Sequence, residues 1–339
     1  MKIETKRPIG RTDLMVSQMG FGGAPLGNMY EGFTDEVARA AVLASFDAGM
    51  SLFDTAPLYG HGLSEHRVGE ALRGKDRDAW VLSTKIGRLL KPAAPAEIDS
   101  GIFQGVLPFK GVFDYSYDAV MRSVEDSFQR IGTHRIDILL AHDLDVWTHR
   151  SEEARQTYVA QFMAGGYRAM VELREQGAIK AIGAGVNEVS ACQDLLDKGD
   201  FDTFLLAGRY TLLEQGALDG FLPRCAERGV TLMIGGPYNT GILATGAVEG
   251  AYYNYQPAPS DIMERVAKIE AVTKNHGVPL ATAALHFPLH HPQVASIIPG
   301  VRHPDEVARN KTIFESQVPD ALWHELKAEG LVREDAPTP

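Results

Sequence analysis

The sequence is poor in three features: cysteine, excess positive charge and long hydrophobic runs. Its two cysteines, Cys192 and Cys225, cannot build a disulfide framework or a four-ligand zinc site, which favours free thiols in a reducing compartment. The 33 Lys and Arg are outnumbered by 44 Asp and Glu, and a formal net charge of −11 argues against a nucleic-acid surface. No run approaches the ~20 apolar residues of a membrane helix, and residues 1–14 lack the apolar core of a signal peptide. We therefore expect a cytoplasmic protein that binds neither nucleic acid nor membrane.

Eight short apolar runs recur along the chain, separated by polar loops and amphipathic helical patterns. Short apolar runs without alternation are typical of strands that are buried on both faces, as in parallel sheets. The runs lie near Gln18–Gly22, Ser51–Asp54, Trp80–Thr84, Asp137–His142, Ile179–Ala184, Thr203–Ala207, Thr231–Gly235 and Ala295–Ile298. Eight strand–helix units predict an α/β fold, a (β/α)8 TIM barrel, with a doubly wound sheet as the alternative.

The remaining segments complete this predicted architecture. Polar and apolar residues alternate around Gly10 and Asp13, which predicts an N-terminal β-hairpin. No stretch has the composition of an interdomain linker, so residues 1–339 are predicted to form one barrel domain. Irregular stretches near 88–114 and 239–259 predict long loops at the C-terminal mouth, and loops of this length are often functional lids.

Four polar residues stand at or just after predicted strand ends: Asp54, Tyr59, Lys85 and His142. Barrel enzymes carry their chemistry at the mouth where these ends meet. A tyrosine has a free pKa of about 10; a nearby Lys ammonium favours the phenolate, and a carboxylate can hold that Lys charged. A histidine can hydrogen-bond a substrate oxygen or relay a proton. Taken singly, each has a simpler interpretation: Asp54 as a helix cap, Tyr59 as a packing residue, Lys85 as a surface residue and His142 as a core residue. Together the four predict proton transfer at a carbinol oxygen.

The motifs around these four residues resemble those of the aldo-keto reductases. Residues 47–60 read DAGMSLFDTAPLYG, residues 64–72 read SEHRVGEAL, and residues 83–85 read STK. The catalytic tetrad of that family falls residue by residue on the same four positions. The resemblance implies that the tyrosine exchanges the proton, that the lysine, held by the aspartate, lowers its pKa, and that the histidine orients the substrate oxygen.

The resemblance covers essentially the whole chain and extends to one branch of the family. It runs from GFGGAPLG at residues 20–27 to IIPGVRHPDEVARN at residues 297–310. The first of these segments, PFKGVFDYSYD at residues 108–118 and HDLD at residues 142–145 look like bacterial sugar 1-dehydrogenases acting on D-threo-aldoses or L-fucose, and like pyridoxal 4-dehydrogenase.

The resemblance also implies a nicotinamide cofactor, NAD or NADP, that lies extended across the barrel mouth. Asn187 would bond the carboxamide and Tyr210 would stack on the nicotinamide ring. Glycine backbone can approach a pyrophosphate closely because it lacks a Cβ. The other cofactor-binding positions that carry over are Gly23, Gly236, Asn239, Gly241 and Leu243, with Gly300, Arg302, Glu306 and Asn310 at the adenosine end.

Three positions depart from the family pattern. Val186 precedes Asn187 where the family often has Ser, and Ala207 stands where it often has Gln. Glu306 occupies a position at which NADP-preferring members often carry Arg. A carboxylate repels a 2′-phosphate and can accept a bond from a 2′-hydroxyl, so we predict NAD over NADP, although Arg302 lies nearby.

These inferences predict an NAD(P)-dependent dehydrogenase that oxidises the anomeric carbinol of a small aldose to a lactone, with Tyr59 as general base. Oxidation of pyridoxal to its lactone, general aldehyde reduction and a non-catalytic cofactor-binding subunit are alternatives. The expected partner is a small sugar or aldehyde substrate. The sequence does not decide whether the chain forms a homo-oligomer.

A metal-dependent barrel hydrolase is a further alternative, and we expect no metal site. Such an enzyme needs His and carboxylate ligands at several strand ends, where the sequence offers only Asp54 and His142. His286 and His290 share a helical spacing, but no H-E-x-x-H glutamate lies between them and Pro288 disturbs the helix.

Overall fold

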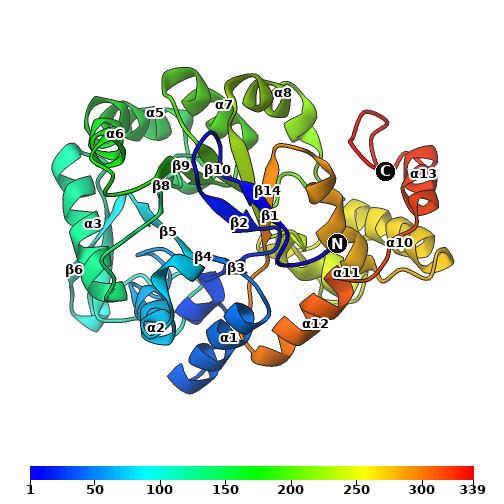
Figure 1. Ribbon diagram of the computed structural model, residues 1–339, viewed down its shortest axis with the longest axis horizontal. Coiled ribbons are helices and arrows are strands. Elements are labelled where there is room, and N and C mark those ends of the chain that lie inside the picture. Colours follow the sequence, from blue (N-terminus) through cyan, green and yellow to red (C-terminus); the bar gives the residue numbers. More distant parts are fainter.

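Eight parallel strands form a barrel in the computed structural model, which describes residues 1–339 (Figure 1). The strand order is β14-β11-β10-β9-β8-β5-β4-β3. The two ends of this order meet, because the backbone N–H of Gly20 donates to the carbonyl of Ile297 at 2.9 Å and that of Gly22 to Pro299 at 3.0 Å. The predicted TIM barrel is therefore confirmed, and the doubly wound sheet is wrong. The strands are β3 (Phe21–Gly22), β4 (Leu52–Asp54), β5 (Val81–Ile86), β8 (Ile138–His142), β9 (Ala181–Val186), β10 (Thr203–Ala207), β11 (Thr231–Gly235) and β14 (Val294–Ile298).

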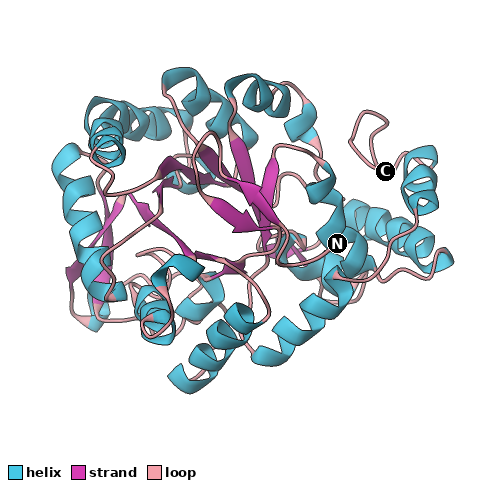
Figure 2. Ribbon diagram, viewed as in Figure 1, coloured by secondary structure: helices cyan, strands magenta, loops and turns pink.

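Helices surround the barrel on its outer side (Figure 2). Their N-termini carry the expected caps: the hydroxyls of Thr34 and Ser116 accept hydrogen bonds from the third amide of α1 and of α3. No helix is long and apolar enough to cross a membrane. The helices are α1 (Asp35–Asp47), α2 (Leu63–Leu72), α3 (Tyr117–Ile131), α4 (Val146–His149), α5 (Glu152–Gln161), α6 (Tyr167–Glu175), α7 (Val189–Lys198), α8 (Phe221–Arg228), α9 (Ile242–Thr245), α10 (Ser260–Asn275), α11 (Leu280–His286), α12 (Pro304–Phe314) and α13 (Asp320–Ala328).

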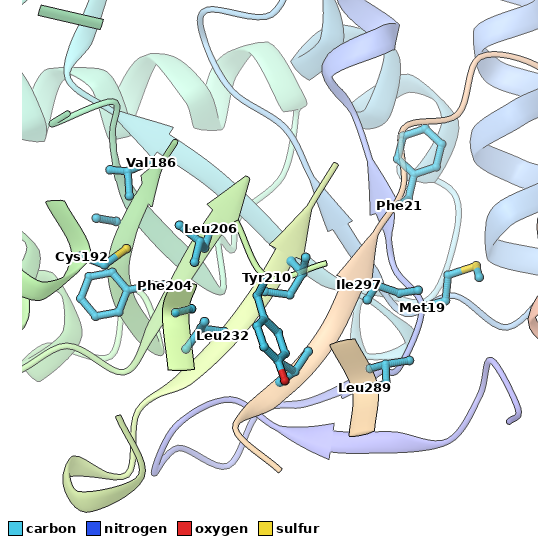
Figure 3. Packing of buried hydrophobic residues seen from close by; sticks show 14 of the residues in the cluster. Met19, Phe21, Val186, Cys192, Phe204, Leu206, Tyr210, Leu232, Leu289 and Ile297 are labelled. Carbon is cyan, nitrogen blue, oxygen red and sulfur yellow. The ribbon is translucent and has the colours of Figure 1, made fainter. Parts of the chain in front are cut away.

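Successive strand residues face opposite sides of the barrel wall. In β10, Phe204 and Leu206 belong to the large hydrophobic layer between strands and helices, whereas Leu205 belongs to a small cluster inside the barrel. Figure 3 shows the outer layer, where Phe204 and Leu206 lie near Cys192 of α7. This period of two follows from strand geometry, and it gives the barrel two separate hydrophobic cores.

A hairpin of β1 (Lys6–Pro8) and β2 (Met15–Ser17) confirms the predicted N-terminal hairpin and lies across the barrel in Figure 1. Its Ile9, Leu14 and Val16 are buried in the same small cluster as the inward strand residues. The guanidinium of Arg7 donates to the carbonyls of Leu289 at 2.8 Å and Val294 at 2.6 Å. The hairpin therefore covers the inner core at the end where strands such as β14 begin.

The two long loops are more regular than the sequence predicted. The stretch 88–114 contains an antiparallel ladder of β6 (Arg88–Pro92) and β7 (Phe109–Phe113). The stretch 239–259 contains α9 and a short ladder of β12 (Tyr252–Tyr253) and β13 (Gln256–Pro257). The prediction of irregular structure is wrong in both places, because backbone pairing between the arms of each loop satisfies groups that the sequence pattern left unassigned.

Two glycines near the end of α2 offer a matched test of packing. A Cβ on Gly69 would lie 1.9 Å from the carbonyl oxygen of Ile131 at the end of α3, whereas a Cβ on Gly74 would meet nothing within 4 Å. We expect Gly69→Ala to lower the free energy of unfolding by about 1–3 kcal/mol through overpacking. Gly74→Ala should change it by less than about 0.5 kcal/mol. Urea denaturation of both variants checks this, and equal effects would contradict the close contact.

Candidate active site

The period of two within the strands aims three of the predicted site residues into the barrel mouth. Leu52, Val81 and Leu140 belong to the inner cluster, and counting by twos along the same strands reaches Asp54, Lys85 and His142 in turn. These three stand at or one residue before the C-terminal end of β4, β5 and β8. The strand geometry thus places three side chains that are distant in sequence on the inner side of the barrel wall, close to its mouth.

A buried ion pair joins two of these strands. Lys85 Nζ donates to Asp54 Oδ2 at 2.6 Å and to the carbonyl of Thr55 at 2.8 Å, and Ser83 Oγ donates to Asp54 Oδ1 at 2.8 Å. Lys85 is 1% exposed and Asp54 2%. Burial raises the pKa of Asp54, and the ammonium of Lys85 opposes that rise. On β9, which is separated from β5 by β8, Gly185 leaves room for the Lys85 stem, since a Cβ there would lie 3.3 Å from its Cε.

Tyr59 follows β4 in the loop and packs against this pair. Its ring centroid lies 4.7 Å from Lys85 Nζ, 5.7 Å from the His142 ring and 6.1 Å from the Phe103 ring. The pKa of Tyr59 is raised well above its usual value, first by burial and then by the carboxylates of Asp54 and Asp143. The pKa of Tyr59 is therefore raised overall, because burial and the nearby carboxylates outweigh the opposing positive charge of Arg88. The lowering of this pKa by Lys85 stays a prediction.

His142 is held by its backbone and is neutral near physiological pH. Tyr115 OH donates to the carbonyl of His142 at 2.6 Å. Burial lowers the pKa of the His142 imidazole well below its usual value, and the positive charges of Arg88 and Lys85 lower it further. A neutral imidazole can hydrogen-bond an oxygen without carrying a full charge.

A cleft of about 690 Å³ opens beside Tyr59 and Asp54. Seven of the predicted cofactor positions line it: Gly23, Gly236, Gly241, Gly300, Arg302, Glu306 and Asn310. The cleft runs between the loops after β3 and β11 and the start of α12. Two of the four predicted catalytic residues, Asp54 and Tyr59, therefore line the same cavity as the predicted cofactor segment at residues 297–310.

Four other predicted cofactor positions do not line the cleft. Tyr210 is fully buried, and its ring packs 5.4 Å from Phe287 in the outer hydrophobic layer, where Figure 3 also places it. The prediction that Tyr210 stacks on a nicotinamide ring is therefore wrong. Leu243 is fully buried as well. The Oδ1 of Asn239 accepts from Thr211 Oγ1 at 2.6 Å, and its Nδ2 donates to the carbonyl of Gly208 at 2.9 Å.

Asn187, the fourth of these positions, lies beside His142 instead. Its Nδ2 donates to Asp145 Oδ2 at 3.1 Å and to Asp143 Oδ1 at 3.3 Å. The predicted donor to a carboxamide is therefore already bonded to two carboxylates.

Glu306 has a structural role that the sequence did not reveal. Its Oε2 accepts from the backbone N–H of Arg302 at 2.7 Å and of His303 at 3.4 Å, which forms a capping box at the start of α12. The carboxylate thus occupies amide donors that could otherwise bind a phosphate. Arg302 pairs with Glu31 at 3.3 Å on the other side of the cleft.

Tyrosines at the rim of the cleft were missed by the sequence analysis. Tyr30, Tyr252 and Tyr255 all line it and are partly exposed. Tyr255 forms the β12–β13 turn with Asn254, and both have left-handed backbone with φ of 62° and 49°. Asn254 is a turn residue that could have indicated this hairpin, whereas Tyr in such a position gives no sequence signal.

The residues around the cleft fit a nicotinamide dinucleotide. Gly23 is required because a Cβ there would lie 2.4 Å from the carbonyl of Asp54, and this contact holds the cleft wall against β4. Gly241, with φ of 107°, would meet nothing within 4 Å, so its backbone stays accessible. Arg309 and Asn310 add polar groups at the far end. These are the donors that a phosphate-linked cofactor needs.

No group of three or more His, Cys, Asp or Glu side chains is placed to hold a metal ion. His286 instead bonds the carbonyl of Phe314 through Nε2 at 2.7 Å, and His290 packs edge-on to Trp323 at 4.9 Å.

The comparisons with known proteins agree with the fold. The sequence pattern of the Aldo/keto reductase family matches residues 18–329. Pyridoxal 4-dehydrogenase of Microbacterium luteolum is 43% identical over 98% of this chain and 99% of its own length. D-threo-aldose 1-dehydrogenase of a Pseudomonas species is 35% identical over 96% of both chains. The holo form of aldo-keto reductase AKR11C1 from Bacillus halodurans shares the fold, with a TM-score of 0.75 at 24% identity over 99% of this chain and 100% of that one.

The barrel, the buried Lys85–Asp54 pair at its mouth and the match to the family pattern are those of an oxidoreductase that acts on CH–OH groups. The chain belongs to the Aldo/keto reductase family. It is accordingly an oxidoreductase that uses a nicotinamide cofactor.

The Lys85–Asp54 pair generates a prediction about stability. Lys85→Met leaves a buried carboxylate unpaired, which we expect to lower the free energy of unfolding by about 3–5 kcal/mol. A carboxyl with a raised folded-state pKa stabilises the protein when protonated, so this deficit should shrink as pH falls from 8 to 5. Arg11→Met, which removes the exposed pair with Asp200, should cost less than about 1 kcal/mol. Denaturant unfolding at both pH values measures this, and a pH-independent loss would contradict the assignment.

Proposed function

We propose that this protein is an NAD-linked dehydrogenase that oxidises the hemiacetal carbinol of a small cyclic aldehyde, an aldose or pyridoxal, to a lactone. The observation that carries the proposal is the arrangement of Tyr59, His142 and the Lys85–Asp54 pair beside the cleft. When bound, the nicotinamide supplies the hydride chemistry, which belongs to the cofactor.

Tyr59 exchanges the proton with the substrate oxygen. Its raised pKa keeps the phenol protonated near neutral pH, which suits it to donate a proton in the direction of reduction. In oxidation the phenolate must accept the hydroxyl proton, so the rate of oxidation should rise with pH. Lys85, 4.7 Å from the ring centroid, stabilises the negative charge that appears on Tyr59. His142 orients the oxygen as a neutral hydrogen-bonding partner.

The candidate substrates share a hemiacetal carbon that can yield a lactone. A 43% identical relative is named for pyridoxal and a 35% identical one for D-threo-aldoses, so both substrates belong in the test and pyridoxal comes first. The aromatic rim of Tyr30, Tyr252 and Tyr255 offers stacking surface to a planar ring or to the face of a sugar.

Tyr59→Phe tests the proton-transfer role. We expect this variant to lose about 10²–10⁴-fold in kcat for oxidation of pyridoxal or L-fucose, together with the rise of rate with pH, because no other group holds the proton. Binding of NADH, followed by its fluorescence, should stay within about threefold of wild type. Near-full turnover in Tyr59→Phe would show that another residue carries the proton.

Cofactor choice is a separate prediction from Glu306. Its carboxylate accepts hydrogen bonds from the backbone amides of Arg302 and His303, just before α12, and repels a 2′-phosphate, so kcat/KM should favour NAD over NADP. Initial rates at limiting concentrations of each cofactor measure the ratio. A clear preference for NADP would mean that Arg302 and Arg309 bind the 2′-phosphate and outweigh the carboxylate.

A further inference from the structure

Arg88 and Asp143 form a second buried ion pair at the barrel mouth, and the roles assigned above do not use it. Arg88 Nη2 donates to Asp143 Oδ2 at 2.7 Å, with the two side chains only 9% and 12% exposed. Arg88 begins β6 just after the STKIG stretch that contains Lys85, and Asp143 directly follows His142. Arg88 therefore lies close in sequence to Lys85, and Asp143 is adjacent to His142.

The free oxygen of Asp143 faces the imidazole of His142. Asp143 Oδ1 lies 3.6 Å from His142 Nε2, which is beyond a hydrogen bond, and its only donor within 3.5 Å is Asn187 Nδ2 at 3.3 Å. A carboxylate oxygen accepts two hydrogen bonds or more, so Oδ1 retains capacity for another donor. The charge of Asp143 also acts on Tyr59, whose pKa it helps to raise. The unused acceptor thus lies beside the His142 imidazole, and the charge of Asp143 reaches Tyr59.

The arrangement is costly for a purely structural feature. Asp143 has a left-handed backbone with φ of 57°, although it is not glycine. Arg88 Nη1 is buried without a hydrogen-bond partner, and its guanidinium lies 4.5 Å from the Phe113 ring centroid. Removing two charges from water usually cancels most of the attraction between them. A left-handed backbone and an unsatisfied buried donor beside His142 point to a role in function.

We propose that Asp143 determines substrate specificity by accepting a hydrogen bond, through Oδ1, from a hydroxyl group one or two carbons away from the reacting carbon. Arg88 is a positioning residue that holds the carboxylate through Oδ2. The inference rests on the proposed function and names its substrate class: hydroxylated hemiacetals are selected over analogues that lack this hydroxyl. A site built to bond a hydroxyl rejects such an analogue because its polar group is then left unpaired.

Aldoses and pyridoxal both present a suitable hydroxyl, at C2 of the sugar and at C3 of the pyridine ring. The test therefore uses two matched pairs of substrates, L-fucose with 2-deoxy-L-fucose and pyridoxal with 3-deoxypyridoxal. The kcat/KM of NAD reduction is measured for each member. If the enzyme prefers the hydroxylated member of only one pair, that pair shows whether an aldose or pyridoxal supplies the hydroxyl.

The wild-type enzyme should favour the hydroxylated member of one pair by about 100-fold or more. Asp143→Asn keeps the size of the side chain and tolerates the left-handed backbone, and it should reduce the preference roughly 10- to 100-fold by slowing the hydroxylated member only. Because Asp143→Asn leaves Arg88 unpaired, the double variant Arg88→Met/Asp143→Asn removes both charges and should show the same loss of preference.

Arg174→Met is the matched control. Arg174 forms a pair of similar length with the buried Asp202, at 2.8 Å, which precedes β10 and so lies at the opposite end of the strands from the mouth. Its loss should lower thermal stability and leave the substrate preference unchanged.

The possible outcomes separate this inference from the function on which it rests. Equal losses on both members of a pair would mean that Asp143 acts only through His142, which overturns the inference. A wild-type enzyme that turns over both members equally well also overturns it and leaves the dehydrogenase function intact. No turnover of any of the four compounds with NAD or NADP overturns both proposals.

Discussion

The bond between Lys85 and Asp54 is the interaction on which the mouth of the barrel depends. It joins β4 to β5 above the inner core, and the same ammonium reaches the carbonyl of Thr55 at the start of the loop that carries Tyr59. The pair therefore fixes the direction in which that loop leaves its strand. Both side chains are buried, so separating them would leave a charged group with neither its partner nor water to stabilise it. An ion pair thus holds the side chains of these two strands together at the mouth, whereas apolar packing holds the inner side chains together elsewhere in the barrel.

The geometry around this pair explains why the site tolerates so few large side chains. Gly185 clears the path of the Lys85 stem, and Gly23 brings the cleft wall within contact of the β4 backbone. Ser83 and Tyr115 fix the orientation of Asp54 and of the His142 backbone. Tyr59 is then surrounded by groups that do not need to move when a proton is exchanged. A preorganised site of this kind avoids reorganisation during the reaction.

The sequence predicted what depends on period and motif, and it failed where side-chain direction decides. Eight apolar runs were enough to predict the barrel, and the predicted strand ends placed Asp54, Lys85 and His142 at its mouth. Tyr210 was misplaced because its motif gives a position along the chain but not the side of the barrel wall that the ring faces. Asn187 and Asn239 were assigned to a ligand, whereas partners distant in sequence bind their amides. The ladders of β6–β7 and β12–β13 depend on pairing within loops whose residues show no clear alternation. The rim tyrosines and the Arg88–Asp143 pair likewise arise from contacts that no local pattern encodes.

The closure of the barrel sets an order for its assembly. β3 pairs with β14 through residues separated by most of the chain, and the N-terminal hairpin covers a core whose last wall comes from the same β14. At a synthesis rate of roughly 5–20 residues per second, the hairpin leaves the ribosome some 15–60 s before its final partner strand does. Throughout that interval Ile9, Leu14 and Val16 have no complete core to enter. The hairpin is thus made long before it can reach its native contacts, and its apolar residues depend on protection by other surfaces until β14 has been made.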